Sequence, residues 1–350
     1  MFNTIKKLLS FFKHKVFAFS PFLFDLGSYE IKINIPEKGI ITIPSLISYH
    51  IHKKDYLFYG KEAKQLIGKL PKEIEIIYPI KKGVVNNFDA LFSLLTFIME
   101  EEILKAWKEF KFKIPLTSAL TAVPYFSTEI EQRASLEVIK KLGFNKVFTV
   151  FSLVALGYGI FENFSELSPT LILDLGAGKT EAGVVGRGGI VFSKHSDISG
   201  FYLDEKIKNY LYIKYGIVIG RNTSERLKIK LLNFNQRKDF LVVKGKALDT
   251  GLPKQIKVNS FEIQEALIPY FHQIIDLIKS LIEESPPEII EEITNNGLYI
   301  AGGLAKTPGL DNFFSDELKI KTFVVEDENV LLKGLKRISQ SQKLLYYSTV

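Results

Sequence analysis

Two short segments of the sequence combine an aspartate with a glycine turn in a way that suits phosphate binding. Asp25-Leu26-Gly27 and Asp174-Leu175-Gly176 each end an apolar run and precede a second strand-like run. The turns themselves, Gly27-Ser28-Tyr29 and Gly176-Ala177-Gly178, would each point several backbone N–H groups at one place, which makes a concave anion site. Two such turns that face each other across a cleft could hold a polyphosphate from both sides.

Charged side chains accompany both turns. Asp25 and Asp174 would point into the cleft from the strand ends, and two carboxylates beside a triphosphate suit Mg²⁺, which keeps most of its waters. Lys32 and Lys179 could neutralise phosphate charge. A lysine that simply faces solvent is an equally good interpretation of Lys32 and a better one of Lys179.

A third glycine element follows much later in the chain. A short apolar run ends at Gly302-Gly303, and Pro308-Gly309 makes a further turn a few residues on. Paired glycines let the backbone approach a flat or anionic ligand where a Cβ atom would collide. Each glycine turn alone is weak evidence, but the three in this order indicate one composite binding site.

The elements that must position these turns alternate between strand-like and helix-like segments. This alternation predicts an α/β protein whose sheets are covered on both faces. Asp25 and Asp174 lie about half a chain length apart, so the two similar segments indicate two domains built on one plan. Two unrelated hairpins are the alternative. We expect strands over 16–26, 30–35, 116–123, 146–151, 170–175, 181–186 and 298–300, and helices over 88–103, 129–142, from about 153, 204–214 and 260–285.

The composition sets further limits. Hydrophobic residues make up 46% and charged residues 24% of the 350 residues, which is ordinary for a globular chain and excludes wholesale disorder. The chain has no cysteine, so disulfides and cysteine-ligated metal centres are excluded. No apolar run reaches the roughly 18 residues that a membrane-spanning helix needs. The net charge of +7 is concentrated near the N-terminus, which argues against a nucleic-acid partner.

The N-terminal segment, residues 1–16, has the pattern of a helix that lies on a membrane surface. Its four lysines fall outside or at the borders of an apolar arc of about 120°, where their ammonium groups could reach lipid headgroups. A terminal helix that packs on the body or on a partner protein is the alternative, and a secretory signal fits poorly. The apolar face consists of Phe2, Ile5, Leu8, Leu9, Phe12 and Val16.

A second candidate membrane contact lies in residues 105–113, where aromatic side chains alternate with lysines. Trp107 and Phe110 suit a membrane interface, and so does Phe112. An equally good interpretation is that these aromatics cap the core of the first domain.

Taken together, the motifs resemble the actin-like ATPase superfamily, and most closely the MreB family of bacterial actins. The two Asp-Leu-Gly turns resemble its first and second phosphate motifs, and Ala301-Gly302-Gly303 resembles its adenosine motif. The resemblance covers nearly the whole chain. Further matching segments are Gly60-Lys61-Glu62-Ala63-Lys64, residues 79–85, Val123-Pro124 followed by Thr128, Glu131 and Arg133-Ala134, and residues 223–228.

The resemblance implies a site for ATP and Mg²⁺, with the metal held by Asp25 and Asp174 through water. The implied phosphate-binding residues are Asp25, Gly27, Ser28, Tyr29, Lys32, Asp174, Gly176, Ala177, Gly178, Lys179 and Thr180. The implied adenosine-binding residues are Glu225, Lys228, Gly302, Gly303 and Leu304.

It also implies the actin-like ATPase fold, with two duplicated, ribonuclease H-like lobes around a nucleotide cleft. We expect domain I over 17–167 with a small subdomain at about 36–80. Domain II would cover 168–326 with a small subdomain at about 200–265, and residues 327–350 would return to domain I.

The sequence departs from the family at positions that matter for hydrolysis. Phe151 stands where the family has a glutamate that positions the attacking water, and phenylalanine can neither orient nor deprotonate water. The threonine pair of the second phosphate motif is Lys179-Thr180 here, and the Gly-Gly-Asp after the following strand is Ser199-Gly200-Phe201. Loss of a water-positioning group could slow the reaction by about 10²–10⁴-fold.

Two functions are compatible with these features. The first is an ATP-binding filament protein on the inner face of the cytoplasmic membrane that guides wall synthesis and cell shape, with slow hydrolysis. Its partners would be copies of itself, the membrane and wall-synthesis proteins. The second is a non-filamentous actin-fold scaffold of a membrane machine, like the pilus protein PilM or the division protein FtsA. The MreB-like segments between the first two motifs favour the first, whereas Phe151 and Lys32 favour the second.

Overall fold

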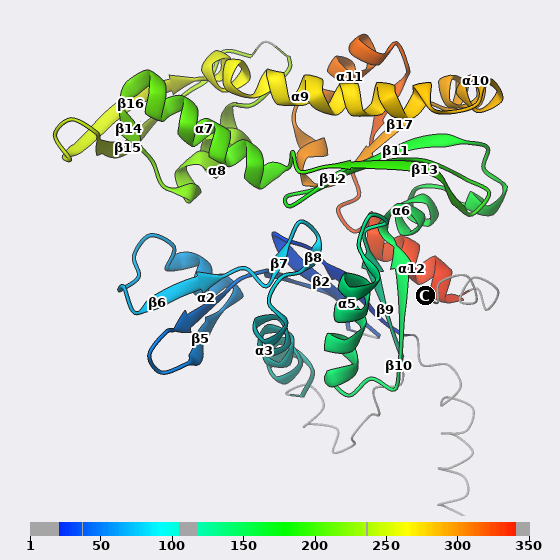
Figure 1. Ribbon diagram of the computed structural model, residues 1–350, viewed down its shortest axis with the longest axis horizontal. Helices are drawn as coiled ribbons and strands as arrows, with labels where there is room; N and C mark the ends of the chain where they lie inside the picture. Colours follow the sequence, from blue (N-terminus) through cyan, green and yellow to red (C-terminus); the bar gives the residue numbers. More distant parts are fainter. Residues whose placement is uncertain (1–20, 37, 105–117, 236, 341–350) are drawn as a thin grey trace, which may run out of the picture.

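The computed structural model describes residues 21–36, 38–104, 118–235 and 237–340. Figure 1 shows two lobes, one above the other, with α6 (Ser152–Ile160) and α12 (Val330–Gln340) between them. Within these residues no helix is both long and apolar enough to span a bilayer. The predicted membrane contacts lie outside the described residues: Phe2, Ile5, Leu8, Leu9, Phe12, Trp107 and Phe110.

The first lobe is built on a five-stranded sheet in the order β10-β9-β1-β2-β3. The strands β1, β2 and β3 pair antiparallel, whereas β9 and β10 continue from β1 in parallel. Asp25 is the one residue of β1 that is not buried, so its carboxylate is directed toward the cleft end of an otherwise apolar strand. The strands are β1 (Phe22–Leu26), β2 (Glu30–Ile35), β3 (Gly39–Pro44), β9 (Ser118–Val123) and β10 (Lys146–Phe151).

The second lobe repeats this plan strand for strand. Its sheet has the order β13-β12-β11-β17-β18, with β11, β12 and β13 antiparallel and β17 and β18 continuing from β11 in parallel. The internal duplication predicted from the two Asp-Leu-Gly turns is therefore confirmed. The strands are β11 (Thr170–Leu175), β12 (Thr180–Gly186), β13 (Gly189–Ser196), β17 (Leu298–Ala301) and β18 (Thr322–Val324).

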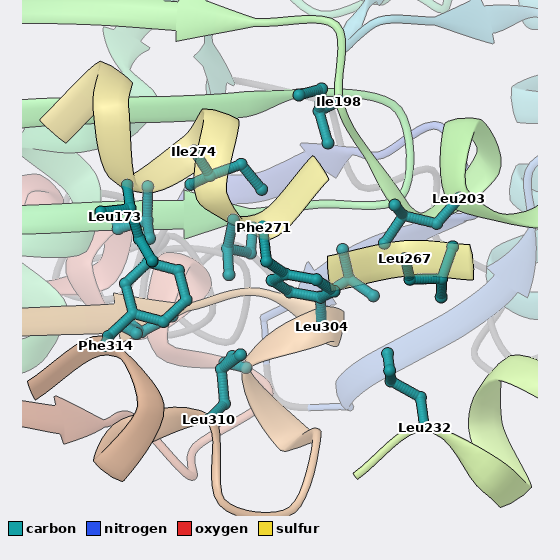
Figure 2. Packing of buried hydrophobic residues seen from close by; sticks show 14 of the residues in the cluster. Leu173, Ile198, Leu203, Leu232, Leu267, Phe271, Ile274, Leu304, Leu310 and Phe314 are labelled. Atoms are coloured by element: carbon teal, nitrogen blue, oxygen red, sulfur yellow. The ribbon is translucent and has the colours of Figure 1, made fainter. Parts of the chain in front are cut away.

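Each sheet is covered on both faces, as the alternation of elements predicts. In the first lobe α3 (Phe88–Ile98) and α5 (Glu129–Lys141) bury one face, and a π-helical turn, Met99–Leu104, extends α3. In the second lobe α9 (Ser260–Glu283) and α11 (Leu310–Leu318) do the same, and Phe271 and Phe314 fill the space between helix and sheet (Figure 2).

A separate apolar cluster joins the inner faces of the two lobes. Leu153 and Leu156 of α6 and Leu332 and Leu335 of α12 pack there with Leu23 and Leu120 of the first sheet and Ile172 and Val185 of the second. The helix α12 thus returns from the second lobe to pack beside α6. Because this cluster contains residues of both sheets and α6 contacts both, the floor of any cleft between the lobes is a packed core.

Each lobe also carries a smaller sheet. In the first lobe β4, β5 and β6 form it, next to α2 and the β7–β8 hairpin, and in the second lobe β14, β15 and β16 form it beside α7 and α8. The two small sheets lie at the same end of the molecule in Figure 1. The bounds are β4 (Ile47–His50), β5 (Asp55–Tyr59), α2 (Gly60–Gln65), β6 (Ile74–Ile77), β7 (Ile80–Lys81), β8 (Val84–Val85), α7 (Gly200–Tyr215), β14 (Ile217–Val218), α8 (Arg221–Leu231), β15 (Phe240–Ala247), β16 (Pro253–Asn259) and α10 (Pro287–Asn296).

Most predicted elements are present, with differences at their ends. The helix predicted over 204–214 begins earlier, at Gly200, because its first N–H groups bond to the second phosphate turn: Gly200 donates to Gly176 and Phe201 to Ala177. The helix predicted from about 153 begins at Ser152. Of the strand predicted over 16–26, the described part runs from Phe22 to Leu26.

Candidate functional site

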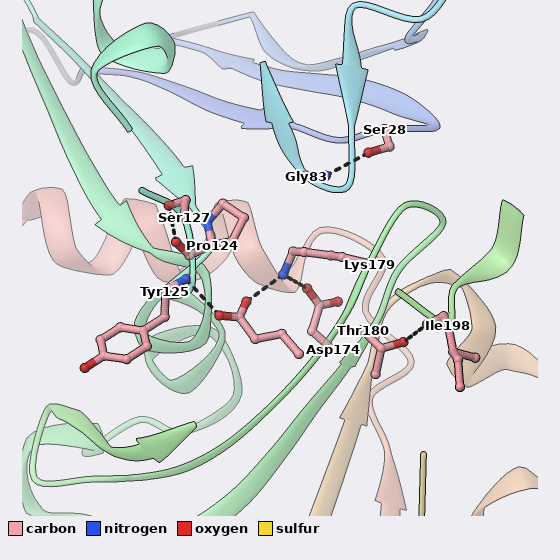
Figure 3. Close-up of polar contacts among 10 residues, drawn as sticks. Ser28, Gly83, Pro124, Tyr125, Ser127, Asp174, Lys179, Thr180 and Ile198 are labelled. Carbon is pink, nitrogen blue, oxygen red and sulfur yellow. Dashed lines mark hydrogen bonds and ion pairs between the residues drawn. The ribbon is translucent and has the colours of Figure 1, made fainter. Parts of the chain in front are cut away.

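Both aspartate turns and the Gly302-Gly303 turn meet in one cavity of about 240 Å³ between the lobes. Thr180 is not among its lining residues, because its hydroxyl is buried and donates to Ile198 O at 2.5 Å (Figure 3). Leu304 lines the neighbouring cavity instead. The predicted phosphate-site residues that line this cavity are Asp25, Gly27, Ser28, Tyr29, Lys32, Asp174, Gly176, Ala177, Gly178 and Lys179, together with Gly302 and Gly303.

The two phosphate turns are already in close contact. A Cβ atom at Gly178 would fall 2.2 Å from Ser28 Oγ, so only glycine fits against the turn of the other lobe. Ser28 Oγ in turn accepts the N–H of Gly83, at 3.0 Å, from the β7–β8 hairpin. This arrangement brings the tips of both turns to one place, as the two-sided polyphosphate site requires.

The glycine turn of the third element also lies against the second aspartate turn. Gly302 has a φ of +94°, and a Cβ atom there would lie 2.4 Å from Leu175 O and 2.9 Å from Asp174 Oδ1. A residue with a side chain would therefore push this strand end away from β11. The result is a backbone-lined wall next to the Asp174 carboxylate.

In the first lobe Asp25 faces Lys32 across the β1–β2 pair. The Lys32 ammonium lies 3.2 Å from Glu30 Oε1 and donates to Glu328 O at 2.7 Å. The pKa of Asp25 is raised to about 6, chiefly because the carboxyl is buried; the ammonium groups of Lys32 and Lys179 oppose this rise, whereas Asp174 and Glu30 add to it.

In the second lobe Lys179 lies between two carboxylates (Figure 3). Its Nζ is 2.8 Å from Asp174 Oδ2 and 2.6 Å from Glu181 Oε2, and the Lys179 side chain is only 12% exposed. Burial alone would lower the pKa of Lys179, but Asp174 and Glu181 outweigh it and hold the pKa above its ordinary value. Lys179 is therefore a permanent internal cation and not the solvent-facing lysine that the sequence favoured.

This ion cluster bears on the expected magnesium site. Asp174 Oδ2 is already paired with the Lys179 ammonium, so a hydrated Mg²⁺ at Asp174 would stand beside a fixed positive charge. Among the described residues no group of three or more carboxylate or histidine side chains is placed to hold a metal ion. The residues around Asp174 therefore do not fit the metal that the resemblance implies, and binding of Mg²⁺ through Asp25 and Asp174 stays a prediction.

Phe151 ends β10 and precedes the first turn of α6. Its ring packs edge-on against Tyr125 at 4.9 Å between centroids, and it lines a second cavity, not the phosphate cavity. Its neighbour Ser152 lines the phosphate cavity. The position that the family resemblance assigns to the water-positioning glutamate thus carries a side chain that faces away from the two aspartates.

Next to the phosphate cavity lies a cavity of about 370 Å³ that contains the implied adenosine residues Glu225, Lys228, Gly303 and Leu304. The ammonium of Lys228 is buried, 2.7 Å from Asp204 Oδ1, and donates to Gly200 O at 2.6 Å. The two cavities are adjacent, since they share the lining residues Tyr29, Glu30, Ala177, Gly303, Lys306 and Glu328. A nucleotide could therefore extend from one to the other.

A polar contact closes the cleft above these cavities. Tyr29 Oη donates to Glu225 Oε1 at 2.6 Å, and Lys64 Nζ donates to the same hydroxyl at 2.7 Å. Beside them the Arg221 guanidinium lies 4.3 Å from the ring centre of Tyr78 and 4.1 Å from that of Phe201. Glu225 is thus held by the opposite lobe.

Several of these residues were missed at the sequence level. Lys64, Tyr78 and Arg221 come from separate elements, and no local pattern brings them together. Glu181 could have been found, because residues 179 and 181 share one face where the strand begins. Its second oxygen accepts the N–H of Tyr125 at 2.8 Å, which ties the second phosphate motif to the first lobe.

Comparison with known proteins agrees with this geometry. The family described as MreB/Mbl protein matches residues 20–346. The cell shape-determining protein Mbl of Bacillus subtilis is 30% identical over 306 residues, which is 87% of this chain and 90% of Mbl. The cell shape-determining protein MreB of Escherichia coli is 31% identical over 310 residues, 87% of this chain and 88% of its own.

Solved structures show the same relationship. MreB5 of Spiroplasma citri bound to AMPPNP superposes with a TM-score of 0.85 at 28% identity, covering 93% of this chain and 98% of its own. MreB5 bound to ADP gives 0.83 at 29% identity, with coverage of 91% and 95%. A MamK double helical filament gives 0.73 at 18% identity, which supports the actin-like fold alone. On the family match, the curated relatives and the duplicated fold, this chain belongs to the MreB/Mbl family of bacterial actins.

Proposed function

We propose that this chain binds ATP in the cleft between its lobes and assembles into filaments on the inner face of the cytoplasmic membrane. The observation that carries the proposal is the meeting of three glycine turns, from distant parts of the sequence, in one interlobe cavity. The related MreB5 binds ADP and AMPPNP, which supports a nucleotide as the ligand. The backbone N–H groups of the two phosphate turns would hold the phosphates, and Lys32 would neutralise part of their charge.

The adenosine would then occupy the neighbouring cavity. Its apolar wall would include Leu304, and its polar groups would include Glu225 and Lys228. Because Glu225 already accepts a hydrogen bond from Tyr29, an entering base would contact a side chain that both lobes hold. Closure of the lobes and nucleotide binding would therefore favour each other.

We expect hydrolysis to be slow. Phe151 lines the second cavity, and the carboxylates of Asp174 and Glu181 are both ion-paired with the Lys179 ammonium. A general base needs a free acceptor within hydrogen-bond reach of the attacking water. Single-turnover measurements with radiolabelled ATP should show loss of the γ-phosphate far more slowly than nucleotide binding. Turnover as fast as binding would contradict this part of the proposal.

The role in cell shape is supported by the cell shape-determining relatives, and the membrane contact by the predicted N-terminal helix over 1–16. Polymerisation would bring many copies of that helix to one surface, so that the avidity would far exceed the affinity of one copy. Wall-synthesis proteins are the partners that this role suggests.

Cosedimentation tests the assembly. The full-length protein should pellet with ATP, and more so with anionic liposomes. Removal of residues 1–15 should reduce liposome pelleting at least about tenfold, because the basic and apolar contacts of each subunit are lost. The thermal shift on adding ATP should stay unchanged in the truncated protein. Liposome binding without any ATP-dependent pelleting would instead favour the non-filamentous scaffold.

A further inference from the structure

The second phosphate turn contains a buried cation of its own. We propose that the Lys179 ammonium is the resident cation of this cleft, in the place beside Asp174 where a divalent metal would otherwise bind, so that nucleotide binding does not require Mg²⁺. The inference rests on the proposed function, since it concerns the same cleft. It goes beyond the proposed function because it assigns neutralisation of the Asp174 and Glu181 carboxylates to a lysine of the protein and not to a metal ion.

The contacts of Lys179 leave little room for a metal. Its Nζ lies 2.8 Å from Asp174 Oδ2 and 2.6 Å from Glu181 Oε2, so one ammonium links both carboxylates. Glu181 is 1% exposed, and its other oxygen is held by the N–H of Tyr125. Both oxygens of Glu181 and one oxygen of Asp174 are thus engaged, and a metal ion at the other oxygen of Asp174 would lie beside the Lys179 ammonium.

The alkyl chain of Lys179 is held as firmly as its charge. It lies under the turn between β7 and β8, where a Cβ atom at Gly83 would fall 2.9 Å from Lys179 Cδ and 3.1 Å from Lys179 Cε. The hydrogen bond from Gly83 N–H to Ser28 Oγ fixes this turn over the lysine. The ammonium is therefore positioned by the opposite lobe as well as by its ion pairs.

Charge repulsion favours the same conclusion. A hydrated Mg²⁺ at Asp174 would stand a few ångströms from the Lys179 ammonium, in a cleft where burial strengthens like-charge repulsion. If Lys179 were uncharged, Asp174 and Glu181 would face a triphosphate without compensation, and a divalent ion would be needed. The lysine thus supplies beside Asp174 the positive charge that a metal ion would otherwise provide.

Isothermal titration calorimetry with ATP, in EDTA and in Mg²⁺, tests the inference on the full-length protein. The Kd of the wild type should agree within about threefold between the two conditions, whereas Lys179→Thr should bind at least about tenfold more weakly in EDTA than in Mg²⁺. Lys194→Thr is the matched control. Lys194 lies on strand β13 and pairs with Glu284 outside the cleft, so this variant removes one lysine without changing the cleft. It should behave like the wild type.

A metal titration gives a readout without nucleotide. Mn²⁺, which shares the oxygen preference of Mg²⁺, should show no tight site in the wild type by electron paramagnetic resonance, and one new site in Lys179→Thr. ATP binding by the wild type that weakens tenfold or more in EDTA overturns the inference and leaves the proposed function standing, even if the variant does not fold. Absence of ATP binding in both conditions overturns both.

Discussion

The first and second phosphate turns share one backbone plan but balance their charges differently. In the first turn the Asp25 carboxylate faces Lys32 across two paired strands, and Lys32 is also held by Glu30 and by a backbone carbonyl near α12. In the second turn the lysine belongs to the turn itself, and its ammonium lies between Asp174 and Glu181. The duplicated strands thus determine the positions of the two aspartate carboxylates, whereas individual lysine side chains determine how each carboxylate is neutralised.

The difference shows which turn can respond to a ligand. Burial raises the pKa of Asp25 to about 6, so this carboxyl is only weakly stabilised in its charged form. Asp174 has an ammonium in direct contact and a second carboxylate beside it. The first turn is therefore the side of the cleft that a cation or a proton can still change, and the second is already compensated.

The largest effect is expected from removing the ammonium of the second turn. Lys179→Met should lower the free energy of unfolding by about 3–5 kcal/mol, because it leaves two buried carboxylates without their partner. Urea denaturation in EDTA, without nucleotide, measures this loss.

The matched change in the first turn is Lys32→Met. It should cost only about 1–2 kcal/mol, since Glu30, its partner, is one-third exposed and can be solvated. Equal losses in the two variants would mean that the two turns are compensated in the same way, contrary to the comparison.

An effect of similar size should follow from the titration of Asp25. A carboxyl whose pKa is raised on folding stabilises the fold fully below its ordinary pKa of about 4, and loses this contribution as the pH rises through about 6. Asp25→Asn has no such loss. Its stability relative to the wild type should therefore rise by about 2 kcal/mol between pH 4 and pH 7.

Urea denaturation of both proteins at several pH values in this range checks the sign. The comparison with Asp25→Asn cancels the contributions of the other acidic residues. A stability difference that does not change with pH would show that Asp25 is not the buried, proton-binding carboxyl described above.

The smallest effect is expected where the two lobes meet above the cleft. Tyr29→Phe removes the hydroxyl that donates to Glu225 and accepts from Lys64, and should cost about 1 kcal/mol. A double-mutant cycle with Glu225→Gln should give a coupling energy of similar size. Tyr212→Phe, which removes a hydroxyl from a half-exposed ring on α7, is the control and should be neutral. Full additivity of Tyr29→Phe and Glu225→Gln would contradict the contact.

Local sequence patterns were enough to predict the main strands and helices of the two lobes. Apolar runs that end in Asp-Leu-Gly predict two similar strand pairs, and the structure confirms them as β1–β2 and β11–β12 in two sheets of the same topology. The helix expected over 260–285 runs from Ser260 to Glu283, and the structure shows that an Asn259–Glu262 capping box starts it. These features depend on neighbours in sequence, so the sequence alone determines them.

The charge compensation of the cleft was decided only by the tertiary structure. The sequence favoured a solvated Lys179, because a lysine after a glycine turn usually faces water, whereas packing of the β7–β8 turn over it buries the ammonium between two carboxylates. The contact of Tyr29 with Lys64 and Glu225 likewise joins residues from three distant elements. Burial and long-range pairing set these electrostatic properties, and both exist only once the two lobes have closed on one another.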